Sequence, residues 1–502
     1  MQSRFRKTVH FFTVLTTCFW VAGAFPQTPE TYDIVLQGGR VIDPETGLDA
    51  IRNVGVRGDR IVEISRQPLQ GREVINVEGL VVAPGFIDLH AHGQSNKANE
   101  FQAHDGVTTA LELESGRPFL RHWLTSRTGN AMINFGASVA HSVNRIMAME
   151  KYASVTAEIE NIVSEDGLRS ERLDAHFDKV FGARYEALNK QETAKMMENI
   201  AAELAAGGLG IGVPVGYYPG ATREELFRIY EFAAEKKTIV YTHVREINIA
   251  AIQEAIANAA VNGASLHIVH INSMALGRIG VALAMVEAAQ KRGLDITTEL
   301  YPYTAASTSL QSTLFDDGWQ ERMGITFGDL QWEATGERLT EKTFQKYRKQ
   351  GGTVIIHMMK PEWIEAGIRA PFTIIGSDGM PYAPGAHPRS AGTFSRVLGR
   401  YVRDQQVISL MDALAKMTIM PAKRLETVAQ GAHLKGRIQV GCDADITIFD
   451  PDTIIDTATF EEDLSFSKGV QHVLVNGVFV VKNSETVSSV FPGRALLGKY
   501  RQ

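Results

Sequence analysis

The fold class of this chain is decided by residues 238–271, TIVYTHVREINIAAIQEAIANAAVNGASLHIVHI. A run rich in β-branched residues at 238–243 precedes an amphipathic stretch at 247–262, and a second apolar run follows at 265–271. Short apolar runs indicate buried strands, whereas apolar residues repeating every three or four positions indicate a helix. The segment therefore predicts a strand–helix–strand unit, whose two strands lie parallel in one sheet.

The same alternation extends over residues 84–430. Further strands are predicted at residues 85–90, 108–113, 208–213, 295–299, 353–357 and 372–375, and further helices at 191–206, 222–236 and 278–292. Such alternation predicts a parallel sheet, either closed as a (β/α)8 barrel or open and doubly wound. Because no strand leads into a GxGxxG turn, an open dinucleotide-binding sheet has no support, and we favour the TIM-like barrel.

Both ends of the chain have a different pattern of apolar residues from the middle. Short runs with alternating apolar residues dominate residues 30–83, and similar runs recur in residues 431–490, where Asn476-Gly477 predicts a hairpin turn. We expect these two segments to form one small β-sandwich domain beside the barrel at 84–430.

Composition excludes some partners. The chain has 502 residues and a formal charge of -6, and no stretch after residue 30 concentrates Lys or Arg. Nucleic acid is therefore not expected as a partner, because phosphate neutralisation dominates that kind of binding. The sequence leaves the oligomeric state open.

The first 24 residues resemble a signal peptide. Arg4, Arg6 and Lys7 precede an apolar run from Val9 to Phe25, and Ala22-Gly23-Ala24 supplies the small residues before a cleavage site. The alternative is a membrane anchor, but the run contains several polar residues and is short for a span of about 20 apolar residues. We expect export to the periplasm or the medium, with cleavage near Ala24 and no stable membrane anchor.

Two histidines end the first barrel strand, in Ala83-Pro84-Gly85-Phe86-Ile87-Asp88-Leu89-His90-Ala91-His92. Alternate strand residues share one face, so His90 and His92 point to the same side and can bind one divalent cation. Taken alone, such a pair is more often two hydrogen-bonded polar histidines at a strand end than a metal site.

Three later strands also end on residues that bind metals. His243 and His270 each close a strand, and Gly376-Ser377-Asp378-Gly379 follows another. Because active sites of parallel barrels lie at the carboxyl ends of strands, we expect all five side chains to meet at one mouth. His267 is three residues from His270, so strand parity places it on the opposite face and outside the ligand set.

These motifs resemble the amidohydrolase superfamily. The Pro84 to His92 segment is similar to its first-strand HxH, and the flanking β-segments match its small sandwich. Residues 301–309 (YPYTAASTS), 376–379 with 387–394, and 441–451 look like motifs of the N-acyl-D-amino-acid deacylases, the family of the D-aminoacylases and D-glutamate deacylases. The resemblance covers nearly the whole sequence after the leader.

The resemblance implies roles for individual residues. His90 and His92 would hold one divalent metal and His243 and His270 another, with zinc (Zn2+) the expected ion. Asp378 would be the general base and would also touch the first metal. The substrate-binding residues would be Arg389, Tyr301, Tyr303, Ser307 and Ser309. A guanidinium suits a substrate carboxylate because it offers a planar fork, although Arg389 could instead form a surface salt bridge.

The second strand departs from the family pattern, which places a bridging cysteine there. This chain has Ser115 at that position, preceded by Glu112 and Glu114 on one strand face. A carboxylate can bridge two cations with its two oxygens, so we expect Glu114 to be the bridge, with Glu112 as the alternative. Both could also be solvated carboxylates. The candidate for the fourth barrel strand, 208–213, has no lysine for a carbamate bridge.

A further departure concerns the substrate. Asn272 stands where several family members carry a lysine beside the substrate. The resemblance therefore implies metal-dependent hydrolysis of N-acyl-D-amino acids, with less certain substrate range. A cyclic amidase, a dipeptidase or a deaminase would share the ligands. An inactive exported binding protein is the alternative outside enzymes.

Overall fold

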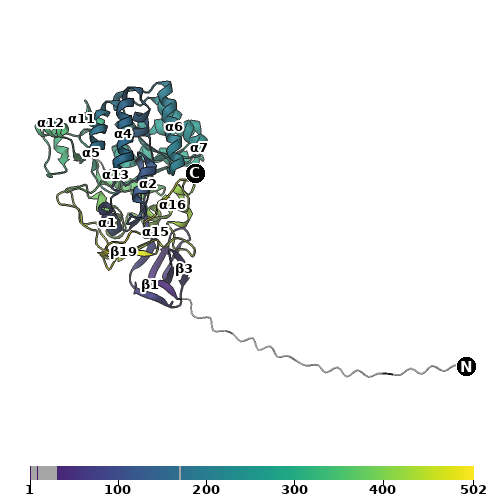
Figure 1. The fold of residues 1–502 in the computed structure, drawn as a ribbon. Helices are drawn as coiled ribbons and strands as arrows, with labels where there is room; N and C mark the ends of the chain where they lie inside the picture. Colours follow the sequence, from purple (N-terminus) through teal and green to yellow (C-terminus); the bar gives the residue numbers. More distant parts are fainter. Residues whose placement is uncertain (2–7, 9–30, 169–170, 502) are drawn as a thin grey trace.

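The computed structural model describes residues 31–168 and 171–501, together with Met1 and Thr8. The predicted leader, residues 1–24, lies outside the described residues except for Met1 and Thr8. A barrel surrounded by helices forms most of the molecule, and a sheet containing β1 (Tyr32–Asp43) and β3 (Arg60–Ser65) lies below it in Figure 1.

The predicted eight-stranded parallel barrel is confirmed. Its strands follow one another in chain order: β6 (Phe86–Asp88), β7 (Val107–Arg117), β8 (Asn134–Ala140), β9 (Ile211–Pro214), β10 (Ile239–His243), β11 (Ser265–Ile268), β12 (Ile296–Leu300) and β16 (Thr373–Ile375). The last strand returns to the first, because the His92 amide donates to the Gly379 carbonyl at 2.8 Å. This closure brings the carboxyl ends of all eight strands to one mouth.

The four predicted helices are also present: α6 (Lys190–Ala206), α7 (Arg223–Lys236), α8 (Ile249–Asn262) and α10 (Ile279–Lys291). Asn189, Thr222 and Asn248 begin the first three, each with a side-chain oxygen that accepts from a first-turn amide. Their apolar faces share one core with β9 to β12.

The remaining helices cover the rest of the barrel and its loops. They are α1 (Asn96–His104), α2 (Leu120–Arg127), α3 (His141–Ala148), α4 (Ala153–Asp166), α5 (Glu171–Lys179), α9 (Ile271–Ala275), α11 (Trp319–Met323), α12 (Glu341–Gln350), α13 (Pro361–Arg369), α14 (Arg389–Arg396), α15 (Leu410–Met417) and α16 (Ile419–Glu426).

Among the described helices, only the stretch Ile271–Lys291 is long and apolar enough to cross a membrane, with a mean hydropathy of 1.3. Half of that stretch is buried, and α10 contributes to the core beneath β11 and β12. Core helices of soluble proteins pass the same test, so this is weak evidence for a span.

Two strand assignments differ from the sequence prediction. Residues 353–357 form β15 (Thr353–Ile356), which belongs to a separate three-stranded antiparallel sheet with β13 (Ala306–Ser309) and β14 (Leu330–Trp332). The third barrel strand is β8, which the sequence pattern did not predict. Its residues NFGASVA are small and partly polar, because Gly136 packs against Leu209 and against the Leu496 backbone. Apolar patterning could not detect such a strand.

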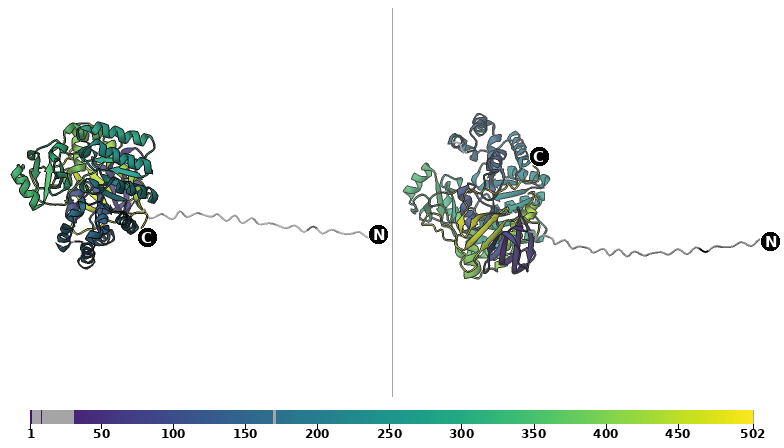
Figure 2. Two further views of the ribbon diagram at one scale, coloured as in Figure 1. Left: turned by 90° about the horizontal axis from the view of Figure 1, so that it is seen from above. Right: turned by 60° about the horizontal axis from the view of Figure 1, so that its bottom comes forward.

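Two insertions project from the barrel as separate lobes. Figure 2 shows the α4 and α5 helices in dark blue on one side and the green segment of residues 306–356 on another. The green segment has its own apolar core, which includes Trp319, Phe344 and Val354. It joins β12 to β16 and so lies over the barrel mouth.

Residues from both ends of the sequence build one nine-stranded sheet. Its strand path runs β20-β19-β18-β17-β5-β1-β2-β3, and β4 pairs with β1. The strands not yet defined are β2 (Leu48–Arg57), β4 (Gly71–Asn76), β5 (Val81–Pro84), β17 (Ile446–Phe449), β18 (Val470–Val475), β19 (Val478–Lys482) and β20 (Glu485–Thr486). Strands from the two ends share one core, and Asn476-Gly477 forms the predicted hairpin with both φ angles positive.

A buried lysine joins this sheet to the barrel. The Lys435 ammonium donates to Asp443 at 2.9 Å and to Asp445 at 2.7 Å. Asp445 also accepts from the Asn134 side chain on β8 at 2.9 Å. These buried polar groups therefore satisfy one another where the two domains meet.

Replacing Lys435 with methionine should destabilise the fold by about 3 kcal/mol, because a buried pair that loses one partner leaves uncompensated charge. Urea unfolding against the exposed Lys342→Met variant measures the difference. An equal midpoint in both variants would show that the contact contributes nothing to stability.

Candidate active site

The four predicted histidines meet at the barrel mouth. His90 and His92 follow β6, His243 ends β10, and His270 comes two residues after β11. The Nε2 atoms of His90 and His92 are 3.3 Å apart. The rings of His243 and His270 have centroids 4.7 Å apart, and the His270 ring lies 5.3 Å from that of His90.

Glu114 lies between the two histidine pairs. Its Oε1 is 2.8 Å from His243 Nδ1 and 3.0 Å from His270 Nε2. Its Oε2 is 3.4 Å from the Nε2 atoms of both His90 and His92. Each carboxylate oxygen therefore faces one pair of histidine nitrogens.

Asp378 completes the cluster from the end of β16. Its Oδ1 is 3.4 Å from His90 Nε2 and 3.3 Å from His92 Nε2, and its Oδ2 is 2.9 Å from Arg389 Nη1. Burial raises the pKa of this carboxyl, but the charges of Arg389 and His90 outweigh burial and lower it. Asp378 and His270 both have positive φ, 51° and 30°, which is uncommon outside glycine. Such strain is concentrated at functional sites.

The outer nitrogens of the first histidine pair are held by carboxylates. Glu299 Oε1 is 2.6 Å from His90 Nδ1, and Glu112 Oε2 is 2.8 Å from His92 Nδ1. These contacts fix each ring and leave its Nε2 directed into the cluster. Glu112, predicted as the alternative bridge, thus lies behind His92 instead of between the two pairs.

Glu299 was not predicted from the sequence, although it ends a predicted strand. Burial raises its pKa, and contacts with His90 and His267 overcome this and lower it to about 2. A carboxylate at the end of a barrel strand was the available signal. His267 does not face away from the barrel: its Nε2 is 3.2 Å from Glu299 Oε2, below the cluster. The alternation of side chains along a strand could not predict the relative placement of His267 and His270, because β11 ends at Ile268. The positive φ of His270 then turns that side chain toward the mouth.

The donor set suits divalent cations. Among the described residues, two overlapping groups have ligand atoms close enough to share an ion: His90, Glu114 and His270, and His90, His92 and Asp378. Four carboxylates are buried here, from Glu112, Glu114, Glu299 and Asp378, against the buried guanidinium of Arg389. Burial lowers the pKa values of His90 and His92, but the carboxylates raise both well above their usual range. A buried site with this excess of negative charge favours bound cations.

Comparison with known proteins identifies the family. The model of the amidohydrolase family matches residues 73–481, which is most of the sequence. The chain belongs to the amidohydrolase family. It is 30% identical to the N-acyl-D-glutamate deacylase of Alcaligenes xylosoxydans xylosoxydans, over 93% of this chain and 97% of that protein. It is also 30% identical to the D-aminoacylase of the same organism, over 89% and 94% of the two proteins.

A solved structure supports the same family assignment. The N-acyl-D-glutamate deacylase of Bordetella bronchiseptica, complexed with zinc and a phosphonate inhibitor that mimics the tetrahedral intermediate, superposes with a TM-score of 0.77 and 26% identity. The match covers 93% of this amidohydrolase and all of that protein.

Three of the five residues expected to bind substrate lie at the cluster. Arg389 is buried, pairs with Asp378, stacks 4.6 Å above the Tyr301 ring and donates to the Ser307 carbonyl at 3.3 Å. Because its side chain is buried, this arginine does not form a surface salt bridge, and its Nε has no hydrogen-bond partner among the described residues. The Tyr301 hydroxyl and the Ser307 hydroxyl are also buried without such partners.

Tyr303 and Ser309 lie elsewhere. The Tyr303 hydroxyl donates to Asp456 at 3.1 Å, and its ring packs on Arg396, behind the barrel mouth. Ser309 is exposed at the end of β13, and its hydroxyl accepts from the Gln311 amide. The sequence motif contains both residues, but neither side chain lines the cavity beside the cluster.

A narrow cavity of about 30 Å³ opens above the cluster of this amidohydrolase. Its wall includes His243, His270, Tyr301, Ser307 and Asp378. The remaining lining residues, of which Ala306 and Thr308 belong to the 301–309 motif, are Tyr217, Ile247, Ser273, Met274, Ala306, Thr308, Leu314, Met323, Ile356 and Met358.

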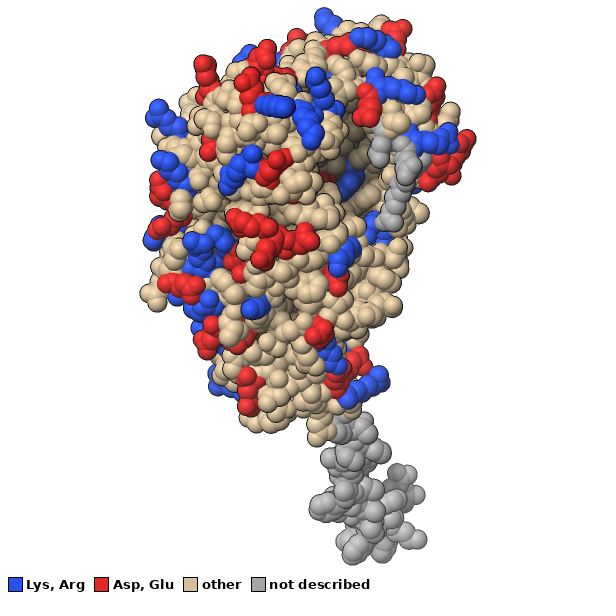
Figure 3. All heavy atoms as spheres, turned by 90° about the vertical axis from the view of Figure 1, so that its left-hand side faces the viewer, with Lys and Arg blue, Asp and Glu red and all other residues tan. Residues whose placement is uncertain are grey.

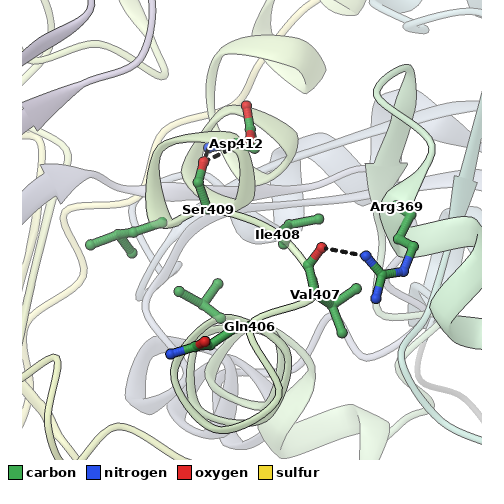
Figure 4. A pocket seen from close by; sticks show the side chains of 8 residues that line it. Arg369, Gln406, Val407, Ile408, Ser409 and Asp412 are labelled. Atoms are coloured by element: carbon green, nitrogen blue, oxygen red, sulfur yellow. Dashed lines mark hydrogen bonds between the residues drawn. The ribbon is translucent and has the colours of Figure 1, made fainter.

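A larger hollow of about 660 Å³ lies away from the cluster, between α13 and α15. Figure 4 shows Arg369 donating to the Val407 carbonyl and Ser409 beside Asp412. These contacts cap and connect helices, and no histidine of the described residues lines this hollow. Figure 3 shows acidic and basic side chains interspersed on one face of the molecule.

Proposed function

We propose that this amidohydrolase hydrolyses the amide bond of N-acyl-D-amino acids, releasing a carboxylic acid and a D-amino acid. The observation that carries the proposal is the arrangement of Glu114 between two histidine pairs, with Asp378 and buried Arg389 beside it. Relatives named as N-acyl-D-glutamate deacylase and D-aminoacylase support the same reaction.

We propose that His90 and His92 hold one divalent metal, that His243 and His270 hold a second, and that Glu114 bridges them. Imidazole and carboxylate ligands suit zinc, which the Bordetella relative contains. A zinc ion bound here would polarise the amide carbonyl and lower the pKa of water. Glu112 is assigned to orienting His92 and not to the bridge.

The protein's own residues supply the remaining steps. The Asp378 carboxylate accepts the proton of the attacking water and passes it to the departing nitrogen. Arg389 binds the substrate carboxylate, its Nε having no hydrogen-bond partner among the described residues, and the Tyr301 ring limits its movement. Residues of the 306–356 segment, among them Ser307, Leu314 and Ile356, line the cavity beside these contacts.

Glu299→Gln should weaken metal binding by about 10- to 100-fold, because the carboxylate orients His90 and raises its basicity. Competition against a chromogenic chelator measures the affinity. Glu158→Gln, on the exposed surface of α4, is the control for the same chemical change. Unchanged affinity in Glu299→Gln would remove this residue from the support of the site.

The proposed function is tested with a panel of substrates. N-acetyl and N-formyl amino acids of both hands are compared with hydantoins and dihydroorotate, using purified protein of known metal content. We expect turnover of the linear compounds of D configuration, because Arg389 needs a free carboxylate. Activity confined to cyclic amides would contradict the deacylase assignment, and absence of both metal and turnover would favour a binding protein.

We also propose that this protein is exported. The support is the basic start, the apolar run and the Ala22-Gly23-Ala24 site of the sequence. Amino-terminal sequencing of protein recovered from the periplasm or medium is expected to begin near Phe25. Recovery of uncleaved protein from the membrane fraction would support an anchor instead.

A further inference from the structure

A second cavity adjoins the candidate active site. It has a volume of about 300 Å³, at the lower end of the range for small-molecule pockets. Ile247, Leu314 and Met323 line both this outer cavity and the narrow cavity above the cluster. These three apolar side chains therefore belong to the walls of both spaces.

The outer cavity lies on the side of the candidate site that is remote from Arg389. Tyr301, Ser307 and Asp378, which contact Arg389, are absent from its wall. Gly216 lines it instead, and a Cβ on Gly216 would lie 2.7 Å from the His243 ring. A molecule with its carboxylate on Arg389 and its amide at the cluster would thus direct its other end here.

The charged residues around the outer cavity are all engaged within the protein. Arg245 pairs with Glu254 at 3.0 Å, and Asp316 pairs with Arg348 at 2.6 Å. The other two charged residues hydrogen-bond neutral groups. Arg322 donates to the backbone carbonyls of residues 314, 316 and 317, and Glu246 accepts from the Asn248 side chain. Of the described charged residues on this wall, only Arg245 and Asp316 are paired with opposite charges, and the side chains of Val215, Pro219, Ile247, Leu314 and Met323 offer apolar contact along the same wall.

We propose that the outer cavity is an acyl subsite, which accepts an uncharged apolar acyl group longer than acetyl. The inference rests on the proposed function, because the scissile amide and the carboxylate on Arg389 set the direction of the acyl group. An apolar tail gains free energy on burial in proportion to its area, so a longer acyl group binds better here. The leaving acid is then a carboxylic acid of medium length.

The experiment compares kcat/KM for N-acetyl-D-leucine and N-octanoyl-D-leucine in the metal-loaded protein. We expect the octanoyl compound to be at least tenfold better, the effect of burying about two methylene groups. Pro219→Trp, which fills the outer cavity, should lower the octanoyl value at least tenfold and leave the acetyl value within about twofold. Pro361→Trp, at an exposed proline of α13, is the matched control.

Each alternative outcome is informative. Equal values for the two substrates, or equal losses for both in Pro219→Trp, would overturn the subsite. If neither compound is hydrolysed, the proposed function fails, and calorimetric binding of the same two compounds decides the subsite separately. Tighter octanoyl binding that Pro219→Trp removes would support it, and equal binding would refute it.

Discussion

Glu114→Gln should abolish metal binding at the second histidine pair and lower activity by more than about 100-fold. The carboxylate directs one oxygen to His243 and His270 and the other to His90 and His92. The glutamine side chain has only one oxygen that can act as a ligand, and its NH2 group is a hydrogen-bond donor. It therefore cannot present an oxygen to both histidine pairs. Loss of a residue that only supports a ligand typically costs about 10- to 100-fold, and loss of a shared ligand should cost more. Elemental analysis and turnover measure the two effects.

Ser115→Ala is the matched control for Glu114. Ser115 stands at the position of the family's bridging cysteine, and its hydroxyl donates to Glu114 Oε2 at 3.3 Å. We expect this variant to keep its metal and most of its turnover. If Ser115→Ala lost metal while Glu114→Gln kept it, the bridge would be the serine and our assignment would be wrong.

Asp378→Asn should keep most of its metal and lose about 10²- to 10⁴-fold in turnover, the usual contribution of general acid–base catalysis. Asparagine retains an oxygen that can face His90 and His92, but it cannot accept a proton. Metal content and kcat, measured on the same preparation, separate the two roles. Near-normal kcat would remove Asp378 from proton transfer.

The Asp378→Asn substitution also removes the ion pair with Arg389, in which Asp378 Oδ2 and Arg389 Nη1 are 2.9 Å apart. Arg389→Lys separates this effect, because lysine keeps the charge and loses the planar fork. We expect Arg389→Lys to raise KM more than it lowers kcat. Asp404→Asn, an exposed aspartate on the stretch that follows α14, controls for the chemical substitution alone.

Much of the fold could be predicted because it depends on local patterns. The β-branched run before His243 and the amphipathic segment after it specify a strand and a helix in any context. Gly136 on β8 shows the limit: a strand pressed against neighbouring backbone uses small residues and loses its apolar signal. Residues 353–357 show the reverse, because an apolar strand does not reveal which sheet it will join.

The candidate site could likewise be predicted only in part from the sequence. Strand-end positions alone place His90, His92, His243, His270 and Asp378 at one mouth, since parallel barrel strands share their direction. Roles that depend on distances across the barrel were not accessible. Glu299 is 209 positions from His90 in sequence, yet its carboxylate is 2.6 Å from the His90 ring.

The sequence by itself determined the order of most strands and helices, the ligand types and their place at strand ends, because these follow from neighbours along the sequence. Tertiary structure decided that Glu114, and not Glu112, lies between the histidine pairs, and that Arg389 faces Asp378. It also excluded Tyr303 and Ser309 from the cavity. The physical reason is that a carboxylate's partner is set by ångström-scale packing of distant segments, and strand periodicity alone does not specify that packing.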